Sequence, residues 1–173
     1  MIVKMKQKDV ESAIERIAEY YKDSALYTAV SNNTNAKQFY IDEYSKDTEL
    51  MVEQGFSYKG YGNYIIAIDP IKFKEDYPEQ YEHYFGIVPV LDAVFEKDSK
   101  RGKYLFLPAF GPKNGTMDKS SHKLINEFLA KHKSYDVFTD FTNNIDTAIL
   151  SKYTDLSEYM VNGVNYFRRP ARG

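Results

Sequence analysis

The residue types and motifs that this 173-residue sequence lacks exclude several classes of function. It contains no cysteine, which excludes disulfide bonds, thiolate metal sites and a cysteine nucleophile. Its three histidines, His83, His122 and His132, show no HxH or HxxxH spacing, so we expect no metal centre. Gly-x-Ser-x-Gly, His-Glu-x-x-His and dinucleotide-fingerprint motifs are also missing. Nothing in the sequence therefore supports a hydrolase or a dehydrogenase.

No apolar run is long enough to span a bilayer, and the N-terminal segment 1–6 lacks the apolar core of a signal peptide. We expect a cytoplasmic protein, or one assembled from the cytoplasm into a phage particle, without a membrane partner. A net charge of -2 gives no general attraction to nucleic acid. The length predicts a single domain over residues 1–173.

Aromatic residues are abundant, with 16 tyrosines and 11 phenylalanines but no tryptophan. Exposed tyrosines suit protein interfaces, so a protein partner or a homo-oligomer is one expectation. Segment 71–85 is charged, tyrosine-dense and interrupted by Pro78. It is interpreted either as an insertion or lid or as a solvated surface connection. Residues 168–173 form a basic tail that we expect to be frayed.

Hydrophobic periodicity predicts an alternation of helices and strands. The clearest helix follows Asp9, where apolar residues recur at i, i+3, i+4, i+7, i+8 and i+11 from Val10 to Tyr21. Further helices are predicted at 36–44 and 145–153, and strands at 2–5, 49–53, 63–68, 87–95 and 164–168.

The centre of the chain predicts a strand over 103–110, a glycine-containing loop, a helix over 118–132 and a strand over 135–141. Two strands joined by one helix should lie parallel, because a right-handed crossover returns the chain to the same sheet. The loop and the helix start form a place where an anion can bind.

This order of elements resembles that of the GNAT superfamily of N-acetyltransferases. The resemblance implies an α/β fold with a mixed, centrally split β-sheet flanked by helices. In that family the fourth strand carries a bulge and splays from the fifth, leaving a gap for the pantetheine arm of acetyl-CoA. Pro108 agrees with this, because proline cannot donate to a ladder and belongs at a bulge or an edge.

The resemblance also implies acetyl-CoA as the cofactor. The family's loop reads Arg/Gln-x-x-Gly-x-Gly/Ala, and its three positions fall here on Thr116, Lys119 and Ser121, of which only Ser121 is small as expected. Asp118 would cap the helix but repel phosphate. The predicted cofactor-binding residues are Ala109, Phe110, Gly111, Lys113, Gly115, Lys119, Ser120, Ser121 and Asn144.

For catalysis, the resemblance implies a tyrosine after the fifth strand that protonates the departing thiolate, and Tyr153 takes that place. Glu96 is the candidate base for an unidentified amine substrate. The alternative is a non-catalytic protein-binding or structural module on the same fold, such as a phage virion component or an inhibitor of a host protein. The loop at 111–121 discriminates between them, because an enzyme needs its amides open to the gap, whereas Phe110 or Met117 filling that gap favours the module.

Overall fold

The computed structural model describes residues 1–23, 31, 35–85, 103–139, 150–161 and 163–172. Their strands form one sheet in the order β1-β2-β3-β4-β5-β7-β6. The strands are β1 Val3–Lys4, β2 Tyr58–Gly60, β3 Asn63–Ile68, β4 Lys103–Gly111, β5 Tyr135–Thr139, β6 Ser157–Val161 and β7 Val164–Arg169. β4 and β5 pair parallel and every other pair is antiparallel, so the sheet is mixed, as predicted.

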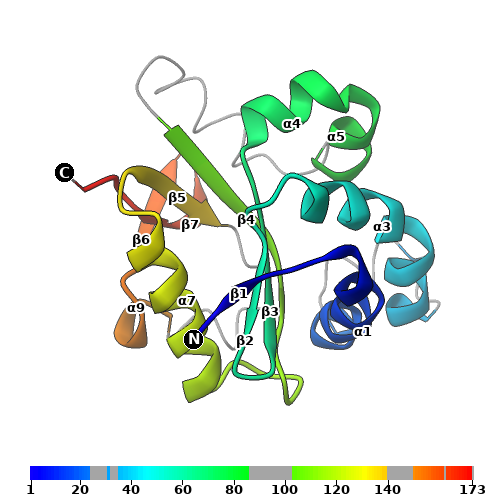
Figure 1. Cartoon of the computed structure of the whole chain (residues 1–173), viewed down its shortest axis with the longest axis horizontal. Helices are drawn as coiled ribbons and strands as arrows, with labels where there is room; N and C mark the ends of the chain where they lie inside the picture. The colour runs from blue at the N-terminus through cyan, green and yellow to red at the C-terminus, as the bar shows by residue number, and fades with distance from the viewer. Residues whose placement is uncertain (24–30, 32–34, 86–102, 140–149, 162, 173) are drawn as a thin grey trace.

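Helices cover both faces of this sheet. They are η1 Gln7–Asp9, α1 Val10–Tyr21, α3 Ala36–Glu53, α4 Pro70–Asp76, α5 Pro78–Phe85, α7 Lys119–Lys131 and α9 Leu150–Tyr153. Figure 1 shows α1, α3, α4 and α5 on one side of the strands and α7 with α9 on the other. The predicted order of strand, helix and parallel strand in the centre of the chain is confirmed as β4, α7 and β5.

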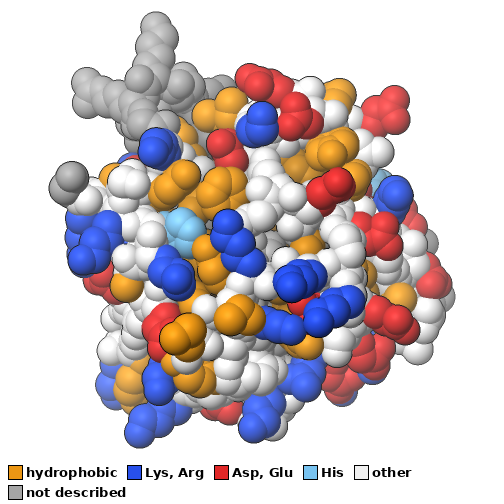
Figure 2. Space-filling view, in the orientation of Figure 1, with side chains coloured by type: hydrophobic (Ala, Val, Ile, Leu, Met, Phe, Trp, Pro, Cys, Tyr) orange, Lys and Arg blue, Asp and Glu red, His pale blue; other side chains and the backbone are white. Residues whose placement is uncertain are grey.

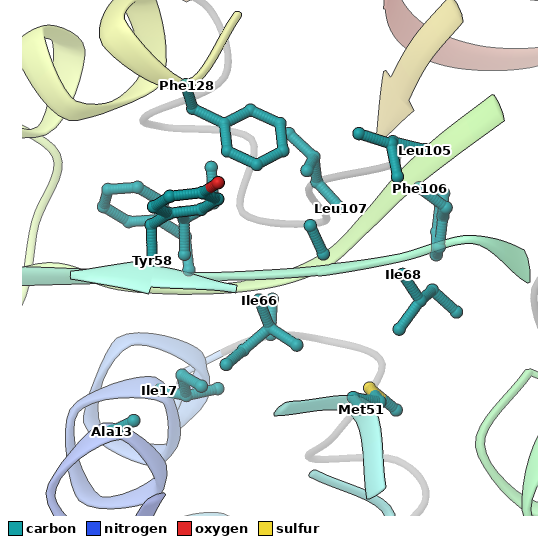
Figure 3. Packing of buried hydrophobic residues seen from close by; sticks show 14 of the residues in the cluster. Ala13, Ile17, Met51, Tyr58, Ile66, Ile68, Leu105, Phe106, Leu107 and Phe128 are labelled. Carbon is teal, nitrogen blue, oxygen red and sulfur yellow. The ribbon is translucent and has the colours of Figure 1, made fainter. Parts of the chain in front are cut away.

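The hydrophobic core lies on both sides of β3 and β4. Ile66 and Ile68 point toward Ile17 and Met51, whereas Leu107 points toward α7 (Figure 3). All four residues from Ile65 to Ile68 are fully buried, which explains why β3 is apolar almost throughout instead of alternating.

The strand predicted at 49–53 is wrong, because these residues are the last turns of α3. Tyr40, Tyr44, Thr48 and Met51 are buried along one side of this helix. Two polar residues, Asp47 and Thr48, belong to that buried stripe, which is why the apolar pattern seemed to end at residue 44. The strand predicted at 87–95 lies outside the described residues, and the helix predicted at 145–153 is described only from Leu150.

Segment 71–85 is not a solvated connection, because it forms α4 and α5 with Phe73 and Phe85 buried. Pro78 interrupts the segment as predicted, because α4 ends at Asp76 and Pro78 begins α5, a position that suits a residue without a backbone N–H. The prediction of a tail frayed from residue 168 is also wrong. Arg168 and Arg169 belong to β7, and Arg169 is only 2% exposed.

Candidate functional site

The site lies where the pairing between β4 and β5 ends, a place that we call the fork. These strands pair from Lys103 with Tyr135 to Phe106 with Phe138. Beyond that point β4 continues to Gly111 along β3 and has no further pairing with the described part of β5. Among the described residues this register agrees with the predicted central split, and residues 140–149, which follow β5, lie outside them.

A bulge in β4 lies where the fork opens. Ile66 lies opposite Ala109 and Ile68 opposite Phe106, so three steps of β4 face two steps of β3. The extra residue falls within the stretch that contains Pro108. A bulge accommodates a residue that cannot donate a ladder hydrogen bond and bends its strand. The bulge expected at Pro108 is thus confirmed.

Thr139 fixes the apex of the fork. Its side chain is fully buried, and its hydroxyl donates to the carbonyl oxygen of Leu107 at 2.8 Å. The threonine thereby satisfies a buried carbonyl of β4 just beyond the last backbone pair between the two strands. That acceptor is therefore paired by the last described residue of β5.

The loop between β4 and α7 ends in a capping box around Asp118. One oxygen of the Asp118 carboxylate, Oδ1, accepts from the backbone N–H of Ser120 at 2.9 Å and of Ser121 at 3.2 Å. The Ser121 hydroxyl in turn accepts from the Asp118 N–H. The Ser120 hydroxyl donates to the carboxylate and lowers the pKa of Asp118, with the backbone amides acting in the same direction. The first amides of α7 are therefore occupied by a carboxylate of the chain itself.

Asn63 holds the other side of the loop. It is 1% exposed, and its Oδ1 accepts from the backbone N–H of Lys113 at 2.7 Å and from the Ser121 hydroxyl at 3.3 Å. Its amide nitrogen donates to the Tyr61 carbonyl and to the Ser120 hydroxyl. One buried side chain thus ties the β2–β3 hairpin to both ends of the loop.

Tyr61, at the tip of that hairpin, contacts α7 directly. Its backbone has a φ of 55°, which is uncommon for a bulky residue. Its hydroxyl donates to the Glu127 carboxylate, and the Lys123 ammonium lies 4.6 Å from the ring centroid. These contacts fix the hairpin that carries Asn63 against α7.

A surface cavity of about 560 Å³ lies where α7 meets α9. Its wall is formed by Lys119, His122, Lys123, Asn126, Glu127, Ala130 and Tyr153. The Tyr153 ring stacks on His122 with centroids 5.2 Å apart and is 51% exposed. Asn126 donates to the Tyr153 carbonyl and accepts from the Asp155 N–H, which anchors the end of α9 on α7.

The structure therefore brings some predicted site residues together and separates others. Lys119 and Tyr153 share the cavity wall, whereas Lys113, Ser120 and Ser121 surround Asn63. Ala109 and Phe110 are buried in β4. Glu96 and Asn144 lie outside the described residues.

Two glycines among the predicted cofactor-binding residues have different roles. Gly115 has a φ of 78° and serves a turn. Gly111 instead lies at the end of β4, where an added Cβ would meet the Cβ of Arg16 at 3.0 Å and a carbon of Ile17 at 3.3 Å. Gly111 thus allows α1 to pack closely against β4.

Three residues that now define the site were not predicted from the sequence, namely Asn63, Thr139 and His122. Asn63 could have been identified from the sequence, since it is a polar residue that begins an otherwise apolar strand next to Gly62. Thr139 and His122 could not, because their partners are distant in sequence.

Charge is unevenly distributed over the surface. Asp and Glu side chains gather along the α3 and α5 margin, whereas Lys and Arg are frequent over α7 and the neighbouring strands (Figure 2). The described residues contain no group of three or more His, Asp or Glu side chains placed to hold a metal. No helix in the described part of the chain is both long and apolar enough to cross a membrane.

Several solved structures match nearly the whole chain, among them the following three. The C-terminal condensation domain of Ebony, in complex with beta-alanyl-dopamine, has a TM-score of 0.65 at 12% identity, covering 97% of this chain and 96% of its own. Arylalkylamine N-acetyltransferase 2 from Aedes aegypti has a TM-score of 0.62 at 10% identity, covering 99% of each chain. The polyamine N-acetyltransferase of Drosophila melanogaster has a TM-score of 0.63 at 13% identity, covering 98% of this chain and 99% of its own.

The chain has the GNAT-like acetyltransferase fold. This confirms the predicted fold class and the resemblance on which it rested. No protein-family model matches the sequence, and no curated protein matches it. At 10 to 13% identity the structural matches establish the fold alone, so activity has to be argued from the site.

Proposed function

We propose that the protein is an N-acetyltransferase that moves an acetyl group from a thioester of the acetyl-CoA type to an amine. The observation that carries this proposal is the register of β4, whose pairing with the described part of β5 ends at Phe106 while its pairing with β3 continues to Gly111. A fork at this place would offer backbone along which an extended thioester arm can lie. The solved structures with this fold include enzymes named for acetylating arylalkylamines and polyamines.

In the proposed reaction the amine nitrogen attacks the thioester carbonyl carbon. A C–N bond forms, the C–S bond breaks, and the leaving thiolate takes a proton. Tyr153 is our candidate for the acid, because it is half exposed on the wall of the cavity that Lys119 also lines. A phenol is a suitable acid for a thiolate, since it releases its proton only as negative charge develops on sulfur. Glu96 remains the proposed base.

The residues fit the two parts of acetyl-CoA differently. The fork is the place proposed for the pantetheine arm, because the described pairing of β4 with β5 ends there. The loop does not suit the diphosphate, because the N–H groups of Lys113, Ser120 and Ser121 already donate to side chains of the chain itself. No step of the reaction is assigned to the nucleotide.

The experiment is an assay of thiol release from acetyl-CoA with phenethylamine-type amines, agmatine and spermidine, with product mass as a second readout. We expect Tyr153→Phe to lower kcat about 100-fold, the scale of a general acid. Tyr159→Phe is the matched control, because Tyr159 is also substantially exposed and lies against another ring. Thiol release without an acetylated amine would refute the proposal, and an unchanged kcat in Tyr153→Phe would remove Tyr153 from the mechanism.

A second candidate is a binding module that keeps this fold without catalysis. The occupied amides of the loop favour it. A protein partner or a homo-oligomer would then be its ligand. The same assay separates the candidates, since a binding module releases no thiol with any amine.

A further inference from the structure

Asp118 occupies the position at the start of α7 where an anionic ligand would otherwise accept hydrogen bonds. Its Oδ1 accepts from two successive backbone N–H groups and from the Ser120 hydroxyl at 2.5 Å. Its Oδ2 accepts from the amide of Asn114 at 3.1 Å. Both oxygens of this carboxylate therefore have partners.

A second, independent contact closes the upstream end of the same loop. The Lys113 N–H donates to Asn63, which comes from β3 and not from the loop. Because Asn63 is 1% exposed and makes four hydrogen bonds, turning it away would leave several buried polar groups unpaired. The loop is thus held in its closed arrangement from outside as well as from within.

A diphosphate and an ionised Asp118 compete for the same amides. Helix N-termini bind phosphate because their first N–H groups are unpaired and carry partial positive charge. Here those N–H groups are paired, and the charge nearest to them is negative. The lowered pKa of Asp118 keeps that charge in place at neutral pH. A diphosphate would have to displace the carboxylate and then remain close to it.

We propose that Asp118 is a specificity-determining residue that excludes the donor diphosphate from the start of α7, so that the acyl donor is recognised by its pantetheine arm. This inference rests on the proposed acetyltransferase function. It means that a thioester without a nucleotide is as good a donor as acetyl-CoA. It also means that the negative charge of Asp118 contributes to the exclusion.

Calorimetric titration with acetyl-CoA, S-acetylpantetheine and ADP tests this inference. In the wild-type protein we expect similar Kd values for the two thioesters, within about 3-fold, and no binding of ADP at millimolar concentration. In Asp118→Asn, which keeps an oxygen acceptor but loses the charge, we expect acetyl-CoA to bind at least about 10-fold more tightly, whereas S-acetylpantetheine is unchanged.

The matched control is Asp155→Asn. Asp155 is an exposed aspartate near the cavity, and its carboxylate pairs with Arg172. Its substitution therefore removes the same charge from a nearby surface. We expect no gain in acetyl-CoA affinity there. Asp118→Ser, which keeps a capping hydroxyl, serves as a second variant, and thermal melts verify that each variant is folded.

Three results would overturn the inference. They are a wild-type preference of more than 100-fold for acetyl-CoA over S-acetylpantetheine, an equal gain in the Asp118 and Asp155 variants, and no gain in either folded Asp118 variant. Failure of the proposed function is distinct, because it appears as absence of acetyl transfer from either thioester. A tighter Kd for ADP in Asp118→Asn would support the exclusion even then.

Discussion

The backbone groups at the two ends of α7 are paired by side chains of opposite charge, one next to the helix in the sequence and one distant from it. At the N-terminus the carboxylate of Asp118 comes from the residue just before the helix and is partly exposed. At the C-terminus the guanidinium of Arg169 comes from β7 and donates to the carbonyls of Leu129, His132 and Tyr135. Each charge therefore interacts favourably with the partial charge of the helix dipole at its own end.

This difference separates a replaceable cap from a structural anchor. The contacts of Asp118 are mostly within three residues of it, so its loss should leave the rest of the fold intact. Arg169 is 2% exposed and joins α7, the start of β5 and β7 through hydrogen bonds that span up to 40 residues. The N-terminal end of α7 is therefore the end that can be altered without unfolding the protein.

Arg169→Met should give the largest loss of stability. It leaves three carbonyls without their donor in a buried site, and a buried polar group left unpaired costs about 1–3 kcal/mol. We expect the free energy of unfolding in urea to fall by more than about 3 kcal/mol. Arg172→Met, which removes an exposed ion pair with Asp155, should cost less than about 1 kcal/mol. Equal losses of unfolding free energy in the two variants would show that Arg169 is not a structural anchor.

Asn63→Ala should give the next largest effect, at the other end of α7. The change removes four hydrogen bonds and leaves the Lys113 N–H unpaired, for an expected loss of about 2–3 kcal/mol. Asn114→Ala is its control, because Asn114 is exposed and makes one hydrogen bond to Asp118. If both variants melt at the same temperature, the hairpin does not support the loop.

Asp118→Ala should cost about 1 kcal/mol, the usual value of an N-cap. The smaller figure follows from its partial exposure, since water can reach the freed amides of Ser120 and Ser121. Urea unfolding with unchanged m-value would verify that only the cap is lost. A loss as large as that in Arg169→Met would mean that the two ends of α7 do not differ.

The fold could be predicted where apolar periodicity is local. The helix from Val10 to Tyr21, the strand from Asn63 to Ile68 and the bulge at Pro108 all follow from the pattern of neighbouring residues. The end of α3 could not, because its buried Asp47 is compensated by His83, 36 residues away. A buried carboxylate cannot be told from an exposed one before its partner is placed.

The candidate site shows the same difference between short-range features, which could be predicted, and long-range contacts, which could not. The capping role of Asp118 was predicted because an N-cap is a short-range pattern. Asn63 and Arg169 were not, since each acts on backbone groups that are close only in the folded protein. A C-terminal segment with three arginines in five residues is expected to be solvated until the carbonyls that accept from Arg169 are known. The long-range contacts that define both ends of α7 are thus the part that sequence patterns do not reach.

The smallest expected effect concerns pH and again distinguishes the C-terminal end of α7. His132 caps that end among aromatic rings, with its Nδ1 close to the Phe128 carbonyl. Burial lowers the pKa of His132, and the nearby charges of Lys131, Arg169 and Lys4 act in the same direction, whereas the Phe128 carbonyl opposes them. Its stabilising contribution is therefore complete above the unfolded pKa of about 6.5 and is lost as the pH falls below that value.

His83 should behave in the opposite way. Its two ring nitrogens lie 2.8 and 2.9 Å from the carboxylates of Asp47 and Glu43, and the hydrogen bond to Glu43 chiefly raises the pKa of His83. Burial raises the pKa of Asp47 although His83 lowers it, so both partners favour holding a proton in the folded state. The contribution of His83 is present below about pH 6.5 and is lost as the pH rises through its folded pKa.

Urea unfolding of the wild type, His132→Asn and His83→Asn between pH 5 and 8 measures both contributions. The stability deficit of His132→Asn relative to the wild type should shrink as the pH falls, because the wild type then protonates a buried ring. The deficit of His83→Asn should shrink as the pH rises, because the wild type then loses its imidazolium. Parallel trends in the two variants would show that the buried end of α7 does not set the protonation of His132.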